Sequence, residues 1–227
     1  MQIYEYISRK LDLRPVLLLI ILYGPIRVLP FGIFGWLQNE DGILEWSSVL
    51  LLLIAAYNVL SLLVSNKNNS RKVIIWTLFL LTLFFMIGEE ISWGERLHGY
   101  SIDFVRSLNT QNETNFHNIK IFHPLEEDAM RYNLRSLLHH GWIIFALILG
   151  IANYLFNKLS FFPASKLSLY FLIPCVWYIL FEYCRFSGRC LITVSNHQEI
   201  YEFLIAIGLW LHTRMQIRKV RTSIHPP

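Results

Sequence analysis

Apolar residues occur along the chain in blocks of about 20, the length that an α-helix needs to cross the hydrocarbon core of a bilayer. The blocks lack the strict alternation of a barrel strand, and a segment in lipid must satisfy its own backbone hydrogen bonds. The pattern therefore predicts an all-α integral membrane protein with about six transmembrane helices. The expected spans are 16–36, 43–64, 73–91, 137–156, 167–186 and 199–217.

The chain is expected to form a single polytopic membrane domain over residues 1–227, because its length suits one domain and no repeat or linker divides it. Segment 92–136, between the third and fourth spans, is then a long extracytoplasmic loop. Lys and Arg are concentrated in short segments on the other side, which places both termini in the cytoplasm and the protein in the cell inner membrane. The basic residues form no continuous face, so the net charge of +4 does not indicate a nucleic-acid partner. The oligomeric state is not predicted.

Most acids and histidines fall on the outer loops or in the outer parts of the expected spans. Acids contribute little to topology, so this asymmetry marks where binding or chemistry takes place. A charge in a span costs about 2.5–3.5 kcal/mol, which favours a polar cavity opening outward over side chains that merely reach to the interface. The residues expected to form a structural polar cluster there are Arg27, Glu45, His139, His140 and Glu182.

The third span ends in a polar motif that runs from Gly88 to Arg96. If the helix continues, Glu89, Trp93 and Arg96 share a face. Adjacent carboxylates near low dielectric repel, so Glu89 and Glu90 must share a proton or meet a cation. We weigh three roles for them: general acid or base, metal ligand, or ion-pair partner of Arg96 and Arg27.

A second motif lies in the loop, where polar residues alternate at period two. In an extended segment they present one face of amides, a carboxylate and an imidazole, which suits sugar hydroxyls or a phosphate headgroup. The alternatives are a lid whose polar groups are tied to the span ends, or an ordinary polar loop. The residues concerned are Asn109, Gln111, Glu113, Asn115 and His117.

The residue types permit a metal site but show no diagnostic spacing. The candidate ligands are Glu90, His117, Glu199 and Glu202. The cofactor is therefore unknown, and a divalent metal is compatible with the chain. Cys184 and Cys190 could pair on an oxidising side; the other interpretation is that the cysteines are buried free thiols.

Three motifs together resemble a family of bacterial multi-span membrane proteins. Members carry E-D-G-x-x-E-W, then G-E-E-I-S-W-G-Q-R, then N-x-Q-x-E-x-N-L-H-N, and this chain matches them over 39–118. It departs at Glu95, where Gln is usual, and at Phe116, where Leu is usual. The resemblance implies a bacterial envelope protein whose three motifs form one site, and it implies no activity.

These observations favour a membrane-embedded hydrolase or transferase, metal-dependent in one version, that acts on a lipid or lipid-linked headgroup in the bilayer. The catalytic candidates are Glu89, Glu90 and His117. The substrate-binding candidates are Trp93, Arg96, Asn109, Gln111, Glu113, Asn115 and Asn118. An ion-coupled transporter and a non-catalytic subunit of an envelope complex are the alternatives, so enzyme activity is left open.

Overall fold

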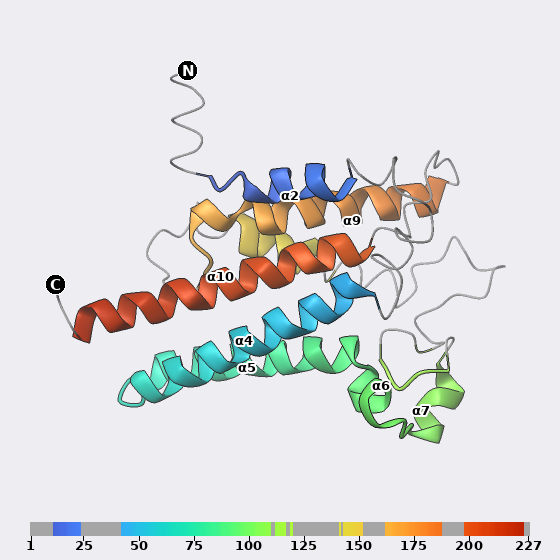
Figure 1. Ribbon diagram of the computed structural model, residues 1–227, viewed down its shortest axis with the longest axis horizontal. Coiled ribbons are helices and arrows are strands. Elements are labelled where there is room, and N and C mark those ends of the chain that lie inside the picture. Colours follow the sequence, from blue (N-terminus) through green and yellow to red (C-terminus); the bar gives the residue numbers. More distant parts are fainter. Residues whose placement is uncertain are drawn as a thin grey trace, which may run out of the picture.

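The computed structural model describes residues 11–23, 42–109, 112–116, 119, 141, 143–151, 162–187 and 198–224. Every regular element in these ranges is helical (Figure 1), and the only strand-like pairing within them is an isolated bridge between Asn109 and Ile119. The elements are α2 (Arg14–Tyr23), α4 (Ile43–Ser65), α5 (Ser70–Glu90), η2 (Ser92–Gly94), α6 (Glu95–His98), α7 (Asp103–Leu108), η5 (Ser165–Leu167), α9 (Leu169–Ser187) and α10 (Gln198–Ile224).

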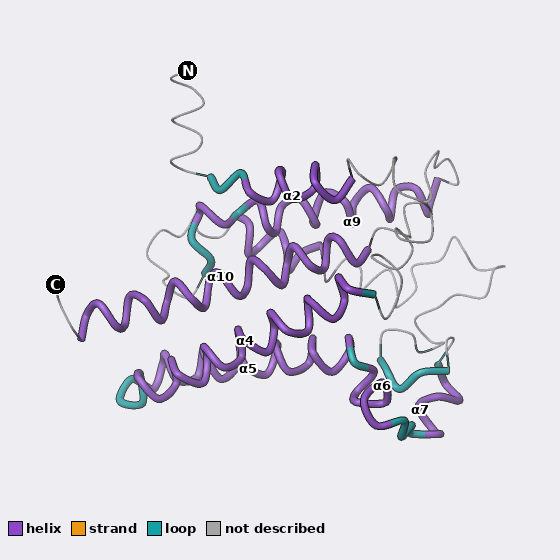
Figure 2. The backbone as a smooth tube through the Cα atoms, in the orientation of Figure 1, coloured by secondary structure: helices purple, strands orange, loops and turns teal. Residues whose placement is uncertain are grey.

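Helix α4 lies between α5 and α10 and packs against both. Helices α4 and α10 run in the same direction, whereas α5 returns antiparallel to them after a short turn (Figures 1 and 2). Helix α9 packs on α10, and α2 packs on α9. The first turns of α4 and α10 and the last turn of α5 therefore meet at one end of the bundle, where α6 and α7 extend beyond it.

The α4–α5 hairpin follows from local sequence signals. Helix α4 buries one stripe of residues spaced three or four apart, including Leu52, Val59 and Leu62, which pack in the common core. Asn69 caps α5, because its side chain accepts a hydrogen bond from the backbone N–H of Lys72 at 3.1 Å. Burial of each such Leu or Val contributes about 1.5–3 kcal/mol, so the stripe fixes how α4 faces its neighbours.

Helices α9 and α10 approach closely at Gly208. A Cβ atom there would lie 2.7 Å from Cζ of Phe171 and 2.8 Å from Cβ of Tyr170, distances that real side chains do not tolerate. Phe171 and Tyr170 are both buried. The absence of a side chain at this position therefore sets the distance between the two helices.

The expectation of about six transmembrane helices is wrong. In the part of the chain that the structure describes, two helices, α4 and α5, are long and apolar enough to cross a membrane. Helix α2 has 10 residues and spans about 15 Å, half of a bilayer core. The apolar part of α9 is limited to Leu169–Phe181. Helix α10 has 27 residues, but its last turns carry Arg214, Arg218, Lys219 and Arg221.

The outward surfaces of α4 and α5 are apolar. Tyr57 and Val64 on α4 are 70% and 73% exposed, and on α5 Leu78 and Leu81 are also exposed. Only 39% of the apolar window of α4 and 28% of that of α5 are buried inside the protein. Both helices thus combine a packed inner stripe with an apolar outer face.

Candidate functional site

Helix α5 ends just after Glu90, before the polar motif is complete. Ser92, Trp93 and Gly94 have φ values of 47°, 52° and 94°, in the left-handed region. A non-glycine residue in this region costs about 1–2 kcal/mol, so surrounding contacts must hold the turn. The helix therefore does not continue to Arg96, so the condition under which Glu89, Trp93 and Arg96 would share a face is not met.

Glycine and tryptophan make the turn compact. A Cβ atom at Gly88 would lie 3.0 Å from the ring of Trp93, so the ring rests directly on the helix backbone. The indole N–H of Trp93 donates a hydrogen bond of 2.7 Å to Glu89 Oε1. After this turn, the chain continues beyond the end of α5 as α6 and α7 (Figure 1).

The segment 112–116, which we name the strap, is tied to this turn by two carboxylates. Glu89 accepts hydrogen bonds from the backbone N–H of Phe116 at 3.0 and 3.2 Å, and Glu95 accepts one from the N–H of Thr114 at 2.7 Å. The strap bends at residues 112–114, and Asn112 has a φ of 58°. The expectation of an extended segment is therefore wrong. Its alternative, a segment tied to the helix ends, describes the geometry.

Arg96 lies at the centre of a network formed by Glu45, Ser92, Arg96, Glu113 and Asn115, which we name the arginine network. Arg96 pairs with Glu45 of α4 through one guanidinium nitrogen and with Glu113 of the strap at 3.4 Å through the other. Glu113 Oε2 also accepts hydrogen bonds from the Ser92 hydroxyl at 3.0 Å and the Asn115 amide at 2.7 Å.

The arginine network is buried at Glu45, Ser92 and Asn115 and partly exposed at Glu113, whose side chain is 25% exposed. Glu45 is 5% exposed, Ser92 is fully buried, and Asn115 is 1% exposed. Asn109, also buried, donates to the backbone and side-chain oxygens of Asn115 at 3.0 and 2.8 Å. Buried charges are tolerated when they are paired and hydrogen-bonded, as these are.

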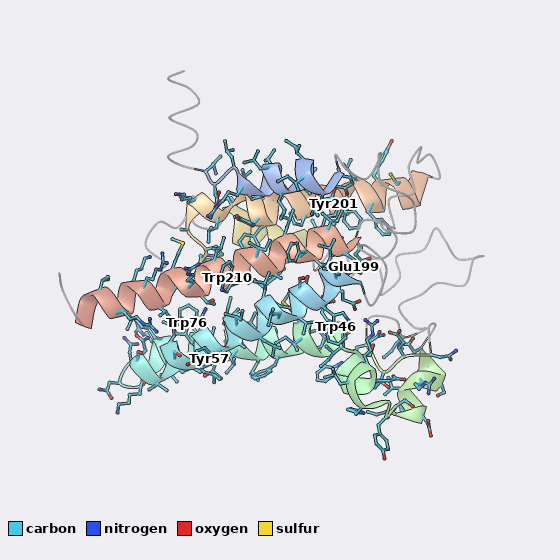
Figure 3. All side chains as sticks on the ribbon, in the orientation of Figure 1. Trp46, Tyr57, Trp76, Glu199, Tyr201 and Trp210 are labelled. Atoms are coloured by element: carbon cyan, nitrogen blue, oxygen red, sulfur yellow. The ribbon has the colours of Figure 1, made fainter. Side chains whose placement is uncertain are left out.

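A second acidic cluster lies beside the network and joins α5 to α10. One carboxylate oxygen from each of Glu90, Glu199 and Glu202 lies within 4.8 Å of the others, and we name these residues the triglutamate cluster. Figure 3 shows Glu199 at the end of α10 that faces the start of α4, near Trp46. The side chains are half-buried, and three carboxylates at this spacing repel one another when they are charged.

Two donors hold Glu202 in place within this cluster. The hydroxyl of Tyr178 on α9 donates to Glu202 Oε1 at 3.0 Å, and the amide of Gln198 donates to the same oxygen at 2.7 Å. Glu90 is subject to the charges of Glu202, Glu199 and Glu45, with Arg96 as the opposing charge. The two clusters are thus electrostatic neighbours.

The structure brings most of the sequence-derived candidates together. Glu45, Glu89, Trp93, Arg96, Asn109, Glu113 and Asn115 surround the turn, and Glu90, Glu199 and Glu202 meet beside it. The described residues do not include Arg27, Gln111, His117, Asn118, His139 and His140, and the side chain of Glu182 is also outside them. The roles assigned to these residues stay predictions.

Sequence reasoning missed two residues of the cluster, Tyr178 and Gln198. Gln198 lies four residues before Glu202 on α10, a spacing that places both on one helix face. That signal was available from the sequence. Tyr178 comes from α9, and nothing local in the sequence connects it with Glu202.

The cysteines differ from one another. Cys184 is disulfide-bonded, so the interpretation of uniformly free thiols is wrong. Cys175 is free and buried, and burial raises the pKa of its thiol. Cys190 lies outside the described residues.

Comparison with known proteins assigns the chain to no family. No protein-family model matches the chain, and no curated protein and no solved structure matches it.

Proposed function

We propose that this chain is an integral membrane protein of the cell inner membrane that binds a divalent cation at the triglutamate cluster and uses it in hydrolysis or transfer at a lipid or lipid-linked headgroup. The observation that carries the proposal is the convergence of Glu90, Glu199 and Glu202 at the end of an apolar helix hairpin. The proposal has two parts, membrane insertion and cation binding, and each is supported separately.

Membrane insertion is supported by the composition and the surface of α4 and α5. Both helices have the length and apolarity of a span, and most of each apolar window faces outward. A core helix of a soluble protein would bury that window instead. Lys67 lies in the turn between them and Arg71 and Lys72 lie in the first turn of α5, and basic residues favour the cytoplasmic side. In this orientation, Glu90 would lie at the non-cytoplasmic interface.

Cation binding is supported by the donor set. Three carboxylates supply only oxygen ligands, which suit Mg²⁺, Mn²⁺ and Ca²⁺ better than the softer metals. The Tyr178 and Gln198 donors occupy one oxygen of Glu202 and leave its other oxygen for a ligand. A bound divalent ion would offset the mutual repulsion of the three groups and polarise a phosphoryl or carbonyl oxygen.

The proposal of a headgroup substrate rests on the depth of the triglutamate cluster in the membrane. Glu90 is the last residue of α5, so the cluster lies where a spanning hairpin would meet the lipid headgroups. Arg96, a substrate-binding candidate in the sequence, is held by Glu45 and Glu113. The cation at the cluster is therefore the better candidate for binding an anionic headgroup.

The test measures Mn²⁺ binding to the detergent-purified full chain by electron paramagnetic resonance. We expect saturable binding in wild type and in the control Asp103→Asn, which alters an exposed carboxylate on α7. We expect loss of binding in Glu90→Gln and in Glu202→Gln. Equal binding by all four proteins, or none by wild type, contradicts the proposal.

The reaction is tested on protein reconstituted in a bacterial polar lipid extract. Lipids are analysed by mass spectrometry with and without Mn²⁺. A headgroup change that requires both Mn²⁺ and an intact Glu90 supports a hydrolase or transferase. If Mn²⁺ binds and no lipid changes, the result supports the proposed cation site and contradicts the proposed hydrolase or transferase activity.

A further inference from the structure

The region after α5 has an inverted distribution of polar and apolar side chains. We name residues 92–116, as far as they are described, the end lobe; it comprises η2, α6, α7 and the strap. Its interior is polar, because Ser92, Asn109, Thr114 and Asn115 are buried. Most of its charged groups also face one another, as in the pairs of Arg96 with Glu113 and of Arg106 with Glu95.

Its surface, by contrast, is rich in large apolar side chains. Tyr100 is 81% exposed, Phe104 73%, Leu97 64% and Ile102 56%. In water, a lobe of this size would be expected to bury such side chains and expose its charges. An exposed apolar surface of this extent indicates contact with another apolar phase or partner.

The apolar surface of the lobe continues that of the hairpin. The rings of Phe85 on α5 and Trp93 lie 6.0 Å apart, and those of Trp93 and Phe116 lie 5.5 Å apart. Each of the three side chains is exposed. A row of aromatic rings therefore leads from the outer face of α5 onto the strap, and the Glu89 carboxylate beside it is hydrogen-bonded to the Trp93 indole and the Phe116 backbone.

We infer that the end lobe is an interfacial membrane element, embedded at headgroup depth with Leu97, Tyr100, Ile102 and Phe104 against the acyl chains. Aromatic side chains favour this depth, and short helices with an apolar surface lie in it. The exposed Asp103 and the half-exposed Arg106 fit the headgroup layer rather than the hydrocarbon centre. The lobe thereby holds the triglutamate cluster at the membrane surface.

This inference rests on the membrane insertion in the proposed function, and one experiment separates the two. Single cysteines are introduced at Tyr100 and Phe104, spin-labelled, and reconstituted in lipid vesicles. Leu78→Cys on the outer face of α5 and Asn68→Cys in the α4–α5 turn serve as references for lipid and water. Collisions with oxygen report lipid, and collisions with a nickel chelate report water.

We expect oxygen collisions to exceed nickel collisions at Tyr100→Cys and Phe104→Cys, as at Leu78→Cys and opposite to Asn68→Cys. High nickel accessibility at both lobe positions, with Leu78→Cys in lipid, overturns the inference and leaves membrane insertion intact. Low accessibility to both reagents at the lobe also overturns it, because a protein partner then covers the surface. Nickel accessibility at Leu78→Cys contradicts membrane insertion itself. Leu97→Cys on α6 replaces any lobe variant that fails to fold.

Discussion

The arginine network and the triglutamate cluster lie side by side at one end of the bundle but balance their charges differently. In the network, both carboxylates, Glu45 and Glu113, pair with the one guanidinium of Arg96, which offsets part of their negative charge within the protein. In the cluster, Glu90 and Glu202 form no ion pair with a described residue. Helix ends that lie together can thus supply either a structural tie or a site for an added cation.

Loss of a carboxylate should have different consequences in the arginine network and in the triglutamate cluster. A group in the network is part of a satisfied hydrogen-bond system, so its removal leaves buried partners without a bond. A carboxylate in the cluster repels its neighbours, so its neutralisation relieves strain in the protein without bound cation. The four predictions that follow test this contrast, from the largest expected effect to the smallest.

The largest effect is expected from Arg96→Met. Loss of the guanidinium leaves Glu45 buried without its cation, and breaking a buried pair costs about 3–5 kcal/mol. Thermal unfolding in detergent measures the loss. The control Arg106→Met removes a more exposed cation, 3.7 Å from Glu95, and should cost about 0–1 kcal/mol. If Glu45→Gln/Arg96→Met is no more stable than Arg96→Met alone, the pair is not what stabilises the turn.

Ser92→Ala tests the hydrogen bonds around Glu113. The Ser92 hydroxyl is fully buried and donates to Glu113 at 3.0 Å. Loss of a bond to a charged group should lower the free energy of unfolding by about 1.5–3 kcal/mol. Ser107→Ala, which removes an exposed hydroxyl on α7, should change it by less than about 0.5 kcal/mol. Equal effects of the two substitutions would show that burial of Ser92 has no energetic consequence.

Glu90→Gln should change the free energy of unfolding in the opposite direction, toward greater stability. Neutralising one of three carboxylates that meet within 4.8 Å should stabilise the protein in a chelator-containing buffer by on the order of 1 kcal/mol. Added Mn²⁺ should raise the melting temperature of wild type and leave that of the variant unchanged. Asp103→Asn should match wild type in both buffers. Destabilisation by Glu90→Gln without metal would show that the cluster, like the network, is satisfied internally.

The smallest effect concerns an acid at the opposite end of the bundle. Burial raises the pKa of the Asp12 carboxyl, but hydrogen bonds and charge from Arg14 outweigh it, so the pKa lies below its usual value. Its contribution to stability is therefore present above the unfolded pKa, about 3.9, and is lost as the pH falls through the folded value. Asp12→Asn should flatten the acid limb of a pH–stability profile slightly, since Arg14 is 66% exposed. An unchanged profile contradicts the pairing.

The sequence correctly predicted that the regular elements are helical, as they are in the part of the chain that the structure describes, and it predicted the two apolar helices of the hairpin. The expected spans 43–64 and 73–91 match α4 and α5 closely, because continuous apolar runs specify a helix with little help from the rest of the fold. The other expected spans shared that composition only in part. Apolar content alone could not distinguish a spanning helix from one that packs against it, such as α9 or α10.

For the candidate site, the sequence by itself determined which residues were ionisable and, to within a few residues, the bounds of α4 and α5. It could not determine pairing, because Glu45, Arg96 and Glu113 are brought together by the packing of α4 against α5 and by the turn at Ser92. Likewise, Glu90 and Glu202 are far apart in the chain and meet only because the end of α5 lies beside the start of α10. The charge of a side chain is a property of the residue. Whether a carboxylate lies beside a guanidinium or beside another carboxylate depends on the distances between them, and only the tertiary structure sets those distances.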